Sequence, residues 1–379
     1  MTERESRRKF LKQAGTVAAA TGVVGLTGCA QSDCTPAAAD ASGVTQFKPV
    51  KWKMVTTWPK NFPGLGRGAE TIARYINEMT AGRIEVKVYG GGELVPPFEA
   101  FDAVSRGTAE MSHGASYYWK GKTEAAQFFT AVPFGLNIQE MNGWLYHGGG
   151  LELWRELYEP FGIVPFPGGN TGLQMGGWFN KEINSVDDLV GLKMRIPGMG
   201  GEILKRAGAT PQAIPGAEIY TSLQSGVIDA TEWVGPYNDL AFGLNEVGQY
   251  YYYPGWQEPS AALECCVNKE AYEALPEDLQ RIVAIACQAG DLDMQADFTA
   301  NNHKALAQLR EQGLDMRPFP DDVLNRLADI AEEVVAEVAD NDELSNRIYQ
   351  SYMAFQESVR GYHKASEHSY GDFIHNRRS

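Results

Sequence analysis

Two successive alternations of strand and helix patterns constrain the fold of this chain more than any other feature of its sequence. Residues 50–57 read VKWKMVTT, in which apolar and lysine positions alternate, and this predicts a half-buried strand. The first set comprises strands at 50–57, 84–89 and 110–115, separated by helices at 65–81 and 98–106. Strands that alternate with helices pair in parallel through right-handed crossovers. We therefore expect a parallel sheet that binds ligands at the carboxyl ends of its strands.

A second set of the same kind follows a predicted long helix at 139–158 and a strand at 162–167. It comprises strands at 172–180, 192–195, 210–214 and 229–234, with helices at 198–207 and 216–226, and a further strand is expected at 261–268. Together the two sets predict an α/β fold with two lobes. Strands that cross between the lobes near 172–180 would form the hinge.

After Pro276 the patterns become helical, with helices expected at 277–312, 321–340 and 342–372. The last of these carries Ile348, Tyr352, Phe355 and Val359 at nearly helical spacing. This apolar face either packs on the body of the same chain or protrudes and is buried against a second subunit.

The N-terminus has the pattern of an export signal. Ser6-Arg7-Arg8-Lys9-Phe10-Leu11-Lys12 matches the twin-arginine pattern, and the weakly apolar run 14–26 is too short to span a bilayer. Leu26-Thr27-Gly28-Cys29 is a lipobox, in which Cys29 would be lipidated, although an ordinary cleavage site remains the alternative. We expect export to the periplasm, with 30–47 as a flexible tether.

Charge and cysteine content limit the classes of partner and site. The whole chain carries a net charge of −15, and the first 29 residues contribute +3, which leaves −18 for the rest. Such a charge argues against nucleic acid or an anionic membrane as partner. The cysteines show no metal-binding or disulfide-framework spacing, and we interpret Cys265 and Cys266, within a predicted buried strand, as small core residues.

The stretch 172–236 contains the most informative polar residues. Arg195 follows an apolar run and precedes Ile196-Pro197 and the glycine-rich helix start at 198–201. A guanidinium offers two parallel donors to a carboxylate, and the free amides of a helix N-terminus add positive partial charge. An ordinary salt bridge between the lobes is the alternative role for Arg195.

Oxygen-bearing side chains flank this predicted anion site. Gln174 lies upstream, and the pair Glu232-Trp233 lies downstream. An amide oxygen and a carboxylate are suited to a hard cation held beside the anion. A surface position is the alternative for Glu232.

Signals of catalysis are missing from the sequence. The six histidines show no HExxH pairing, and no GxSxG elbow, Walker loop or GxGxxG turn occurs. Tyr117-Tyr118-Trp119 follows a predicted strand end and either walls a pocket or packs as a loop over the sheet. The aromatic run 250–253 either lines the cleft or packs against it. An exported chain of two lobes without a nucleophile is better interpreted as a binder.

These features together resemble the extracytoplasmic solute-binding subunits of TRAP (tripartite ATP-independent periplasmic) transporters, DctP type. Within that family the chain looks like the branch that binds 2-oxo acids (alpha-keto acids) or lactate with a metal ion. The resemblance covers essentially the whole mature chain. It rests on Thr56-Thr57-Trp58-Pro59, Ser116-Tyr117-Tyr118-Trp119, Gly172-Leu173-Gln174-Met175, Lys193-Met194-Arg195-Ile196-Pro197-Gly198 and Asp229-Ala230-Thr231-Glu232-Trp233.

The resemblance implies roles for individual residues. Arg195 would bind the substrate carboxylate, Gln174 would contact both substrate and cation, and Glu232 would bind the cation. Trp233 would add its main-chain carbonyl to the cation, Tyr118 would hydrogen-bond the ligand, and Trp58 would roof it. The cation would be sodium or calcium. The resemblance also implies a homodimer formed by exchange of a C-terminal helix.

We therefore expect a two-lobed periplasmic-binding-protein fold with hinge strands and long C-terminal helices. The expected organisation is a signal peptide at 1–29, a tether at 30–47, mainly lobe 1 at 48–170, mainly lobe 2 at 171–268 and a helical region at 269–379. The chain would deliver a small 2-oxo or 2-hydroxy monocarboxylate of the pyruvate or lactate type to TRAP membrane permease subunits. A ligand-binding component of a sensory system and a secreted α/β hydrolase or lyase are the alternatives.

Overall fold

The computed structural model describes residues 49–377. The twin-arginine pattern, Cys29 and the tether at 30–47 lie outside the described residues. No helix within the described range is long and apolar enough to cross a membrane.

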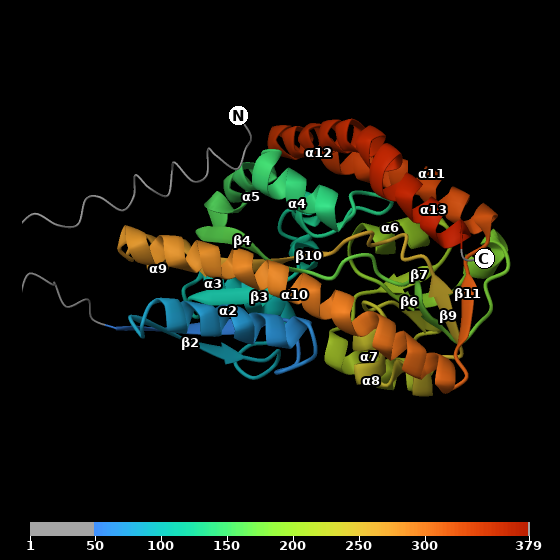
Figure 1. The fold of residues 1–379 in the computed structure, drawn as a ribbon, viewed down its shortest axis with the longest axis horizontal. Coiled ribbons are helices and arrows are strands. Elements are labelled where there is room, and N and C mark those ends of the chain that lie inside the picture. The colour runs from blue at the N-terminus through green and yellow to red at the C-terminus, as the bar shows by residue number, and fades with distance from the viewer. Residues whose placement is uncertain (1–48, 378–379) are drawn as a thin grey trace, which may run out of the picture. The chain divides into compact units, whose positions relative to one another are not determined.

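The first sheet has five strands in the order β2-β1-β3-β10-β4 (Figure 1). Its strands are β1 (Val50–Thr56), β2 (Ile84–Tyr89), β3 (Met111–Gly114), β4 (Ile163–Asn170) and β10 (Ala262–Asn268). β1 pairs in parallel with β2 and β3, as the first alternation predicts, and β10 runs antiparallel to β3 and β4. The crossovers contain α2 (Leu65–Met79) and α3 (Ala100–Ser105).

The second sheet has six strands in the order β11-β9-β5-β8-β6-β7. They are β5 (Gly177–Phe179), β6 (Lys193–Arg195), β7 (Thr210–Gln212), β8 (Ala230–Thr231), β9 (Tyr250–Tyr253) and β11 (Asp315–Pro318). β6 pairs in parallel with β7 and β8, and the connecting helices are α6 (Gly198–Arg206) and α7 (Gly216–Gln224). The second alternation is therefore parallel only over β6, β7 and β8, because β5 runs antiparallel to β8 and β9. Helix α8 (Pro236–Phe242) follows β8.

Two expected elements differ from the structure because glycines interrupt them. The expected strand at 172–180 is reduced to β5, and Gly172, with a φ of 72°, has a left-handed backbone conformation that a strand does not contain. The expected helix at 139–158 is two helices, α4 (Ile138–His147) and α5 (Gly150–Tyr158). They are separated at Gly149, whose φ of 87° is left-handed.

Two extended segments connect the sheets and pair with each other. Residues 171–176 lead from β4 to β5, and 254–261 lead from β9 back to β10. The Thr171 amide donates to the Ala261 carbonyl at 3.1 Å, and the Gly255 amide donates to the Gln174 carbonyl at 3.0 Å. These paired segments are where we expect the hinge.

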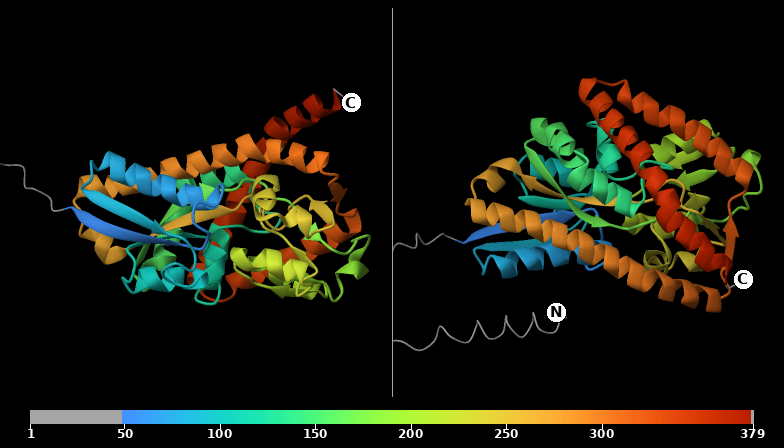
Figure 2. Two further views of the ribbon diagram at one scale, coloured as in Figure 1. Left: turned by 90° about the horizontal axis from the view of Figure 1, so that it is seen from below. Right: turned by 45° about the horizontal axis from the view of Figure 1, so that its top comes forward.

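Long helices cover both sheets. After α9 (Lys269–Glu273), helix α10 (Glu277–Glu311) packs on α2 and β4 and, further along, on α8 (Figures 1 and 2). Helices α11 (Asp321–Ala339), α12 (Glu343–His363) and α13 (Ser369–Asn376) complete the chain, with a π turn at Lys364–His368. Ile348 and Tyr352 are buried against the body of the same chain. The apolar face of α12 therefore packs on its own chain and does not protrude.

The three cysteines within the described range are free and fully buried. Their burial confirms the interpretation of Cys265 and Cys266 as small core residues. The run Tyr250–Tyr253 forms β9, in which Tyr251 and Tyr252 are buried in the second lobe and do not line the cleft.

Candidate functional site

Arg195, at the end of β6, is buried and fully engaged with its neighbours. Its Nε donates to the Ile214 carbonyl at 3.1 Å, and its Nη2 lies 3.4 Å from the Tyr118 hydroxyl. Its Nη1 donates to the Glu232 carboxylate and, at 3.2 Å, to the Glu232 carbonyl. The guanidinium also lies 5.1 Å from the Trp233 ring. Strands β6 and β8 are neighbours, which brings these residues together.

The Arg195–Glu232 ion pair is buried on both sides, with each side chain 1% exposed. Burial raises the pKa of Glu232 to about 7, and the Arg195 guanidinium opposes this rise. The sequence places Arg195 toward a substrate and Glu232 toward a cation, whereas the structure places the two in direct contact. Both belong to the second lobe, so the pair is not a bridge between lobes.

Gln174 and Glu232 each present a buried oxygen that accepts no hydrogen bond. The Gln174 amide nitrogen donates to Glu258 at 2.7 Å and to Thr171 at 3.2 Å, while its Oε1 has no partner. Glu232 Oε2 is likewise without a partner. Buried acceptors left without donors are unfavourable, and uncharged and carboxylate oxygens are what sodium and calcium prefer. The residues present therefore fit a hard cation.

This donor set differs from a conventional metal cluster. Within residues 49–377 no group of three or more His, Cys, Asp or Glu side chains could hold a metal ion. A cation here would depend on the amide oxygen of Gln174 and a main-chain carbonyl in addition to carboxylates.

Glu258 is a site residue that the sequence reasoning missed. It lies on the second connecting segment, is 3% exposed, and accepts the hydrogen bond from Gln174. Burial and the charge of Glu232 raise the pKa of Glu258 well above its usual range. The signal available was the polar pair Gln257-Glu258 between Trp256 and Pro259 in a largely apolar stretch.

Trp58 is held over the site by a buried histidine. Its Nε1 donates to Nδ1 of His113 at 2.8 Å, and the other ring nitrogen of His113 lies 2.9 Å from the Gly168 carbonyl. Burial lowers the pKa of His113 to about 4, so the ring is neutral and donates from Nε2. The Trp58 ring lies 6.2 Å from Tyr118 and 6.1 Å from Trp233.

Residues from both lobes enclose a small space at this point. It has a volume of about 10 Å³, roughly the room of one water molecule. Among the predicted ligand-binding residues, only Glu232 does not line this space. Glu232 is hydrogen-bonded to Arg195, which does line it. Its lining residues include Trp58, Tyr117, Tyr118, Thr171, Gln174, Arg195 and Trp233.

The aromatic motif at 117–119 serves both of its alternative roles. Tyr118 lines the small space, whereas Trp119 is buried and donates from Nε1 to Glu264 at 2.5 Å. Ser116 and Tyr158 also donate to Glu264, each at 2.9 Å. This buried carboxylate fixes the turn that carries Tyr118.

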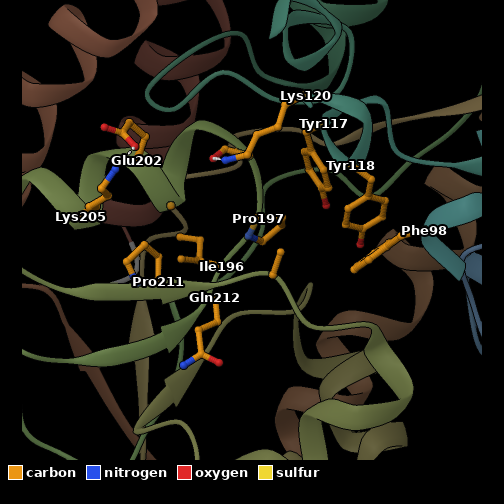
Figure 3. Close-up of a pocket in the computed structure, with 13 residues that line it drawn as sticks. Phe98, Tyr117, Tyr118, Lys120, Ile196, Pro197, Glu202, Lys205, Pro211 and Gln212 are labelled. Carbon is orange, nitrogen blue, oxygen red and sulfur yellow. Dashed lines mark hydrogen bonds and ion pairs between the residues drawn. The ribbon is translucent and has the colours of Figure 1, made fainter. Parts of the chain in front are cut away.

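A larger groove lies outside Tyr118, between the lobes (Figure 3). Its volume is about 290 Å³. Phe98 and Tyr118 face it from the first lobe, and Ile196 and Pro211 from the second (Figure 3). Lys120 Nζ reaches across to the Gly198 carbonyl at 3.4 Å. The groove connects the position of Tyr118 with solvent.

Comparison with known proteins establishes the family. Residues 54–342 match DctP, family 7 of the bacterial extracellular solute-binding proteins. A monocarboxylate 2-oxoacid-binding periplasmic protein of Nostoc sp. is 42% identical over 97% of this chain and 98% of its own length. The chain therefore belongs to the DctP family of solute-binding proteins.

Three solved TRAP solute-binding proteins share the fold closely. That of Pseudoalteromonas atlantica, with bound sodium and pyruvate, is 44% identical, covers 86% of this chain and 99% of its own, and has a TM-score of 0.83. That of Colwellia psychrerythraea, with calcium and pyruvate, is 42% identical with the same coverage and TM-score. That of Bordetella bronchiseptica, with calcium and picolinate, is 39% identical, covers 87% and 98%, and has a TM-score of 0.85.

These findings confirm the resemblance to TRAP receptors, the two-lobed α/β fold and the interpretation as a binding protein rather than an enzyme. The family acts outside the cytoplasm, in agreement with a periplasmic location.

Proposed function

We propose that this protein is the receptor of a TRAP transporter and binds a small 2-oxo or 2-hydroxy monocarboxylate together with sodium or calcium. One observation carries the proposal: a buried arginine lies beside two buried side-chain oxygens that lack partners. The Nostoc relative is described as binding 2-oxoacid monocarboxylates, and two solved relatives contain pyruvate with sodium or calcium. The acid would pass to the membrane permease subunits.

In this proposal Arg195 binds the carboxylate of the acid, because a guanidinium matches its two oxygens. Tyr118, already 3.4 Å from Nη2, donates its hydroxyl to the same ligand, and Trp58 covers it. Gln174 Oε1, Glu232 Oε2 and the Trp233 carbonyl would hold the cation. The cation would supply a positive charge for the carboxylate and for the 2-oxo or 2-hydroxy oxygen beside it.

The charges explain why anion and cation bind together. Arg195 and Glu232 neutralise each other, so an acid alone would add an uncompensated negative charge to a buried site. A cation that takes over part of the Glu232 charge leaves Arg195 free to pair with the ligand. Ligand selectivity follows, because an acid without the neighbouring oxygen offers the cation fewer contacts.

The test is a thermal-shift titration of purified protein with pyruvate, lactate and acetate, each with and without sodium or calcium after chelation. A ligand at one hundred times its Kd adds about 2.7 kcal/mol of stability. We expect this stabilisation when pyruvate or lactate is added together with a cation. We expect none when the acid or the cation is added alone. Stabilisation by acetate equal to that by pyruvate, without a cation, would contradict the proposal.

Variants with a matched control localise the site. Arg195→Met is expected to lose acid binding, and Glu232→Gln is expected to lose the cation requirement or binding. Arg206→Met and Glu337→Gln remove the corresponding exposed ion pair of the same charge types and should bind normally. Normal binding by the first two variants would assign the ligand to another place.

Export and assembly are further parts of the proposal. We propose that the chain crosses the membrane by the twin-arginine route and is anchored through Cys29, both drawn from the sequence. We also propose a homodimer, because the end of α12 and α13 expose large aromatic side chains. Tyr362, Tyr370 and Phe373 are 72%, 69% and 60% exposed. The Bordetella bronchiseptica relative is described as a dimer.

A further inference from the structure

Asp239 is a buried carboxylate next to the site for which the proposed function gives no role. It lies in the first turn of α8 and is 1% exposed. Its Oδ2 accepts from the Tyr251 hydroxyl at 2.6 Å and from Trp178 Nε1 at 3.2 Å. Tyr251 and Trp178 lie on the paired strands β9 and β5, so this oxygen is fixed to the second sheet.

The other oxygen of Asp239 holds the loop that carries the predicted cation ligands. Its Oδ1 accepts from the Val234 amide at 3.4 Å. That amide belongs to the same peptide group as the Trp233 carbonyl. Because a trans peptide is planar, the carbonyl must point away from the atom that accepts from the amide. Asp239 therefore sets the direction of the Trp233 carbonyl.

The next peptide of this loop is held by a different segment of the chain. The Val234 carbonyl accepts from the Met175 amide at 2.9 Å, and Met175 follows Gln174 directly. The Glu232 carbonyl accepts from Thr231 Oγ1 at 2.9 Å and from Arg195 at 3.2 Å. Each carbonyl of the loop is thus oriented by a neighbour, and only that of Trp233 is left to point toward a ligand.

We propose that Asp239 is a positioning residue that aims and polarises the Trp233 carbonyl as a ligand for the cation. This rests on the proposed function, in which that carbonyl binds the cation. A carboxylate that accepts from a peptide N–H increases the negative partial charge of the attached carbonyl oxygen, which strengthens it as a ligand. Tyr251 and Trp178 keep the carboxylate in place.

The test is the affinity for calcium and sodium at saturating pyruvate in Asp239→Asn, a substitution of nearly the same shape. Loss of an outer-shell partner weakens metal binding by about 10- to 100-fold. We expect the Kd for the cation to rise by that factor, and pyruvate affinity to recover when the cation is raised by the same factor. Tyr251→Phe, which removes the 2.6 Å hydrogen bond, should change the Kd for the cation in the same direction by a smaller factor.

Asp291→Asn is the control, since Asp291 is also a buried aspartate, at 3% exposure, but does not line the site. It should leave the Kd for the cation unchanged. If Asp239→Asn and Tyr251→Phe lower only the melting temperature and leave the Kd for the cation unchanged, Asp239 is purely structural and the proposal is overturned. Glu232→Gln distinguishes failure of the Asp239 proposal from failure of the proposed cation site. If this variant also leaves cation dependence unchanged, the proposed cation site itself is wrong.

Discussion

Replacement of Asp291 by asparagine should make the stability of the protein less sensitive to a rise in pH from about 4 to about 7. Asp291 lies on α10, where its Oδ2 is 3.4 Å from the Tyr146 hydroxyl and its Oδ1 has no hydrogen-bond partner. Burial raises the pKa of Asp291 from its ordinary value of 3.8 to about 7, and the hydrogen bond from Tyr146 opposes this. The carboxyl group is therefore neutral in the folded protein at pH values where it is ionised in the unfolded chain.

The sign and size follow from linkage between folding and proton binding. Between pH 4 and pH 7 the folded state holds the proton more firmly, so stability falls as pH rises through this window and levels off above it. Because one pKa unit is worth about 1.4 kcal/mol, the full loss is about 4 kcal/mol. Between pH 5 and pH 8 the loss is about 2 to 3 kcal/mol, and asparagine removes this pH-dependent part.

The assay compares the melting temperatures of the parent protein and Asp291→Asn from pH 5 to pH 8. With an unfolding entropy of about 2.1 cal/mol/K per residue over about 330 residues, 2 to 3 kcal/mol corresponds to about 3 to 4 °C. The advantage of the variant should grow by that amount over the range. Asp293→Asn, at an exposed position on the same helix, should show no such trend. Parallel pH profiles for Asp291→Asn and the parent would refute the reasoning.

Three further predictions concern the site and the dimer. Arg195→Met should destabilise the protein by about 3 to 5 kcal/mol in urea unfolding, because Glu232 is left buried and unpaired. The double variant with Glu232→Met should recover much of this loss, and equal losses in the single and double variants would refute the coupling. His113→Phe should free the Trp58 indole and weaken pyruvate binding about fivefold by titration, in line with a net hydrogen bond of about 1 kcal/mol. An unchanged Kd would show that this bond does not position Trp58. Removal of residues 364–379 should give a monomer by light scattering, and a dimer that survives would place the interface elsewhere.

Glu258 and Gln174 show where sequence reasoning failed. Gln174 was expected within a strand, but it lies on an extended crossing segment that pairs with 254–261. That pairing brings Glu258, 84 positions later, to 2.7 Å from Gln174. No local pattern contains this contact, because it arises only when two distant connecting segments run side by side.

The sequence by itself determined the two parallel units, since the spacing of apolar residues and the order of strands and helices depend on local patterns. The bounds of β2 agree with the expected 84–89, and those of β1 differ from 50–57 by one residue. It also singled out Arg195, Gln174 and Glu232 as candidates, because a guanidinium, an amide oxygen and a carboxylate in one stretch suit an anion held beside a hard cation. Only the tertiary structure decided that Arg195 pairs with Glu232, and that Asp239 accepts a hydrogen bond from the Val234 amide. Those contacts depend on which strands become neighbours, and that is settled by packing across the whole chain.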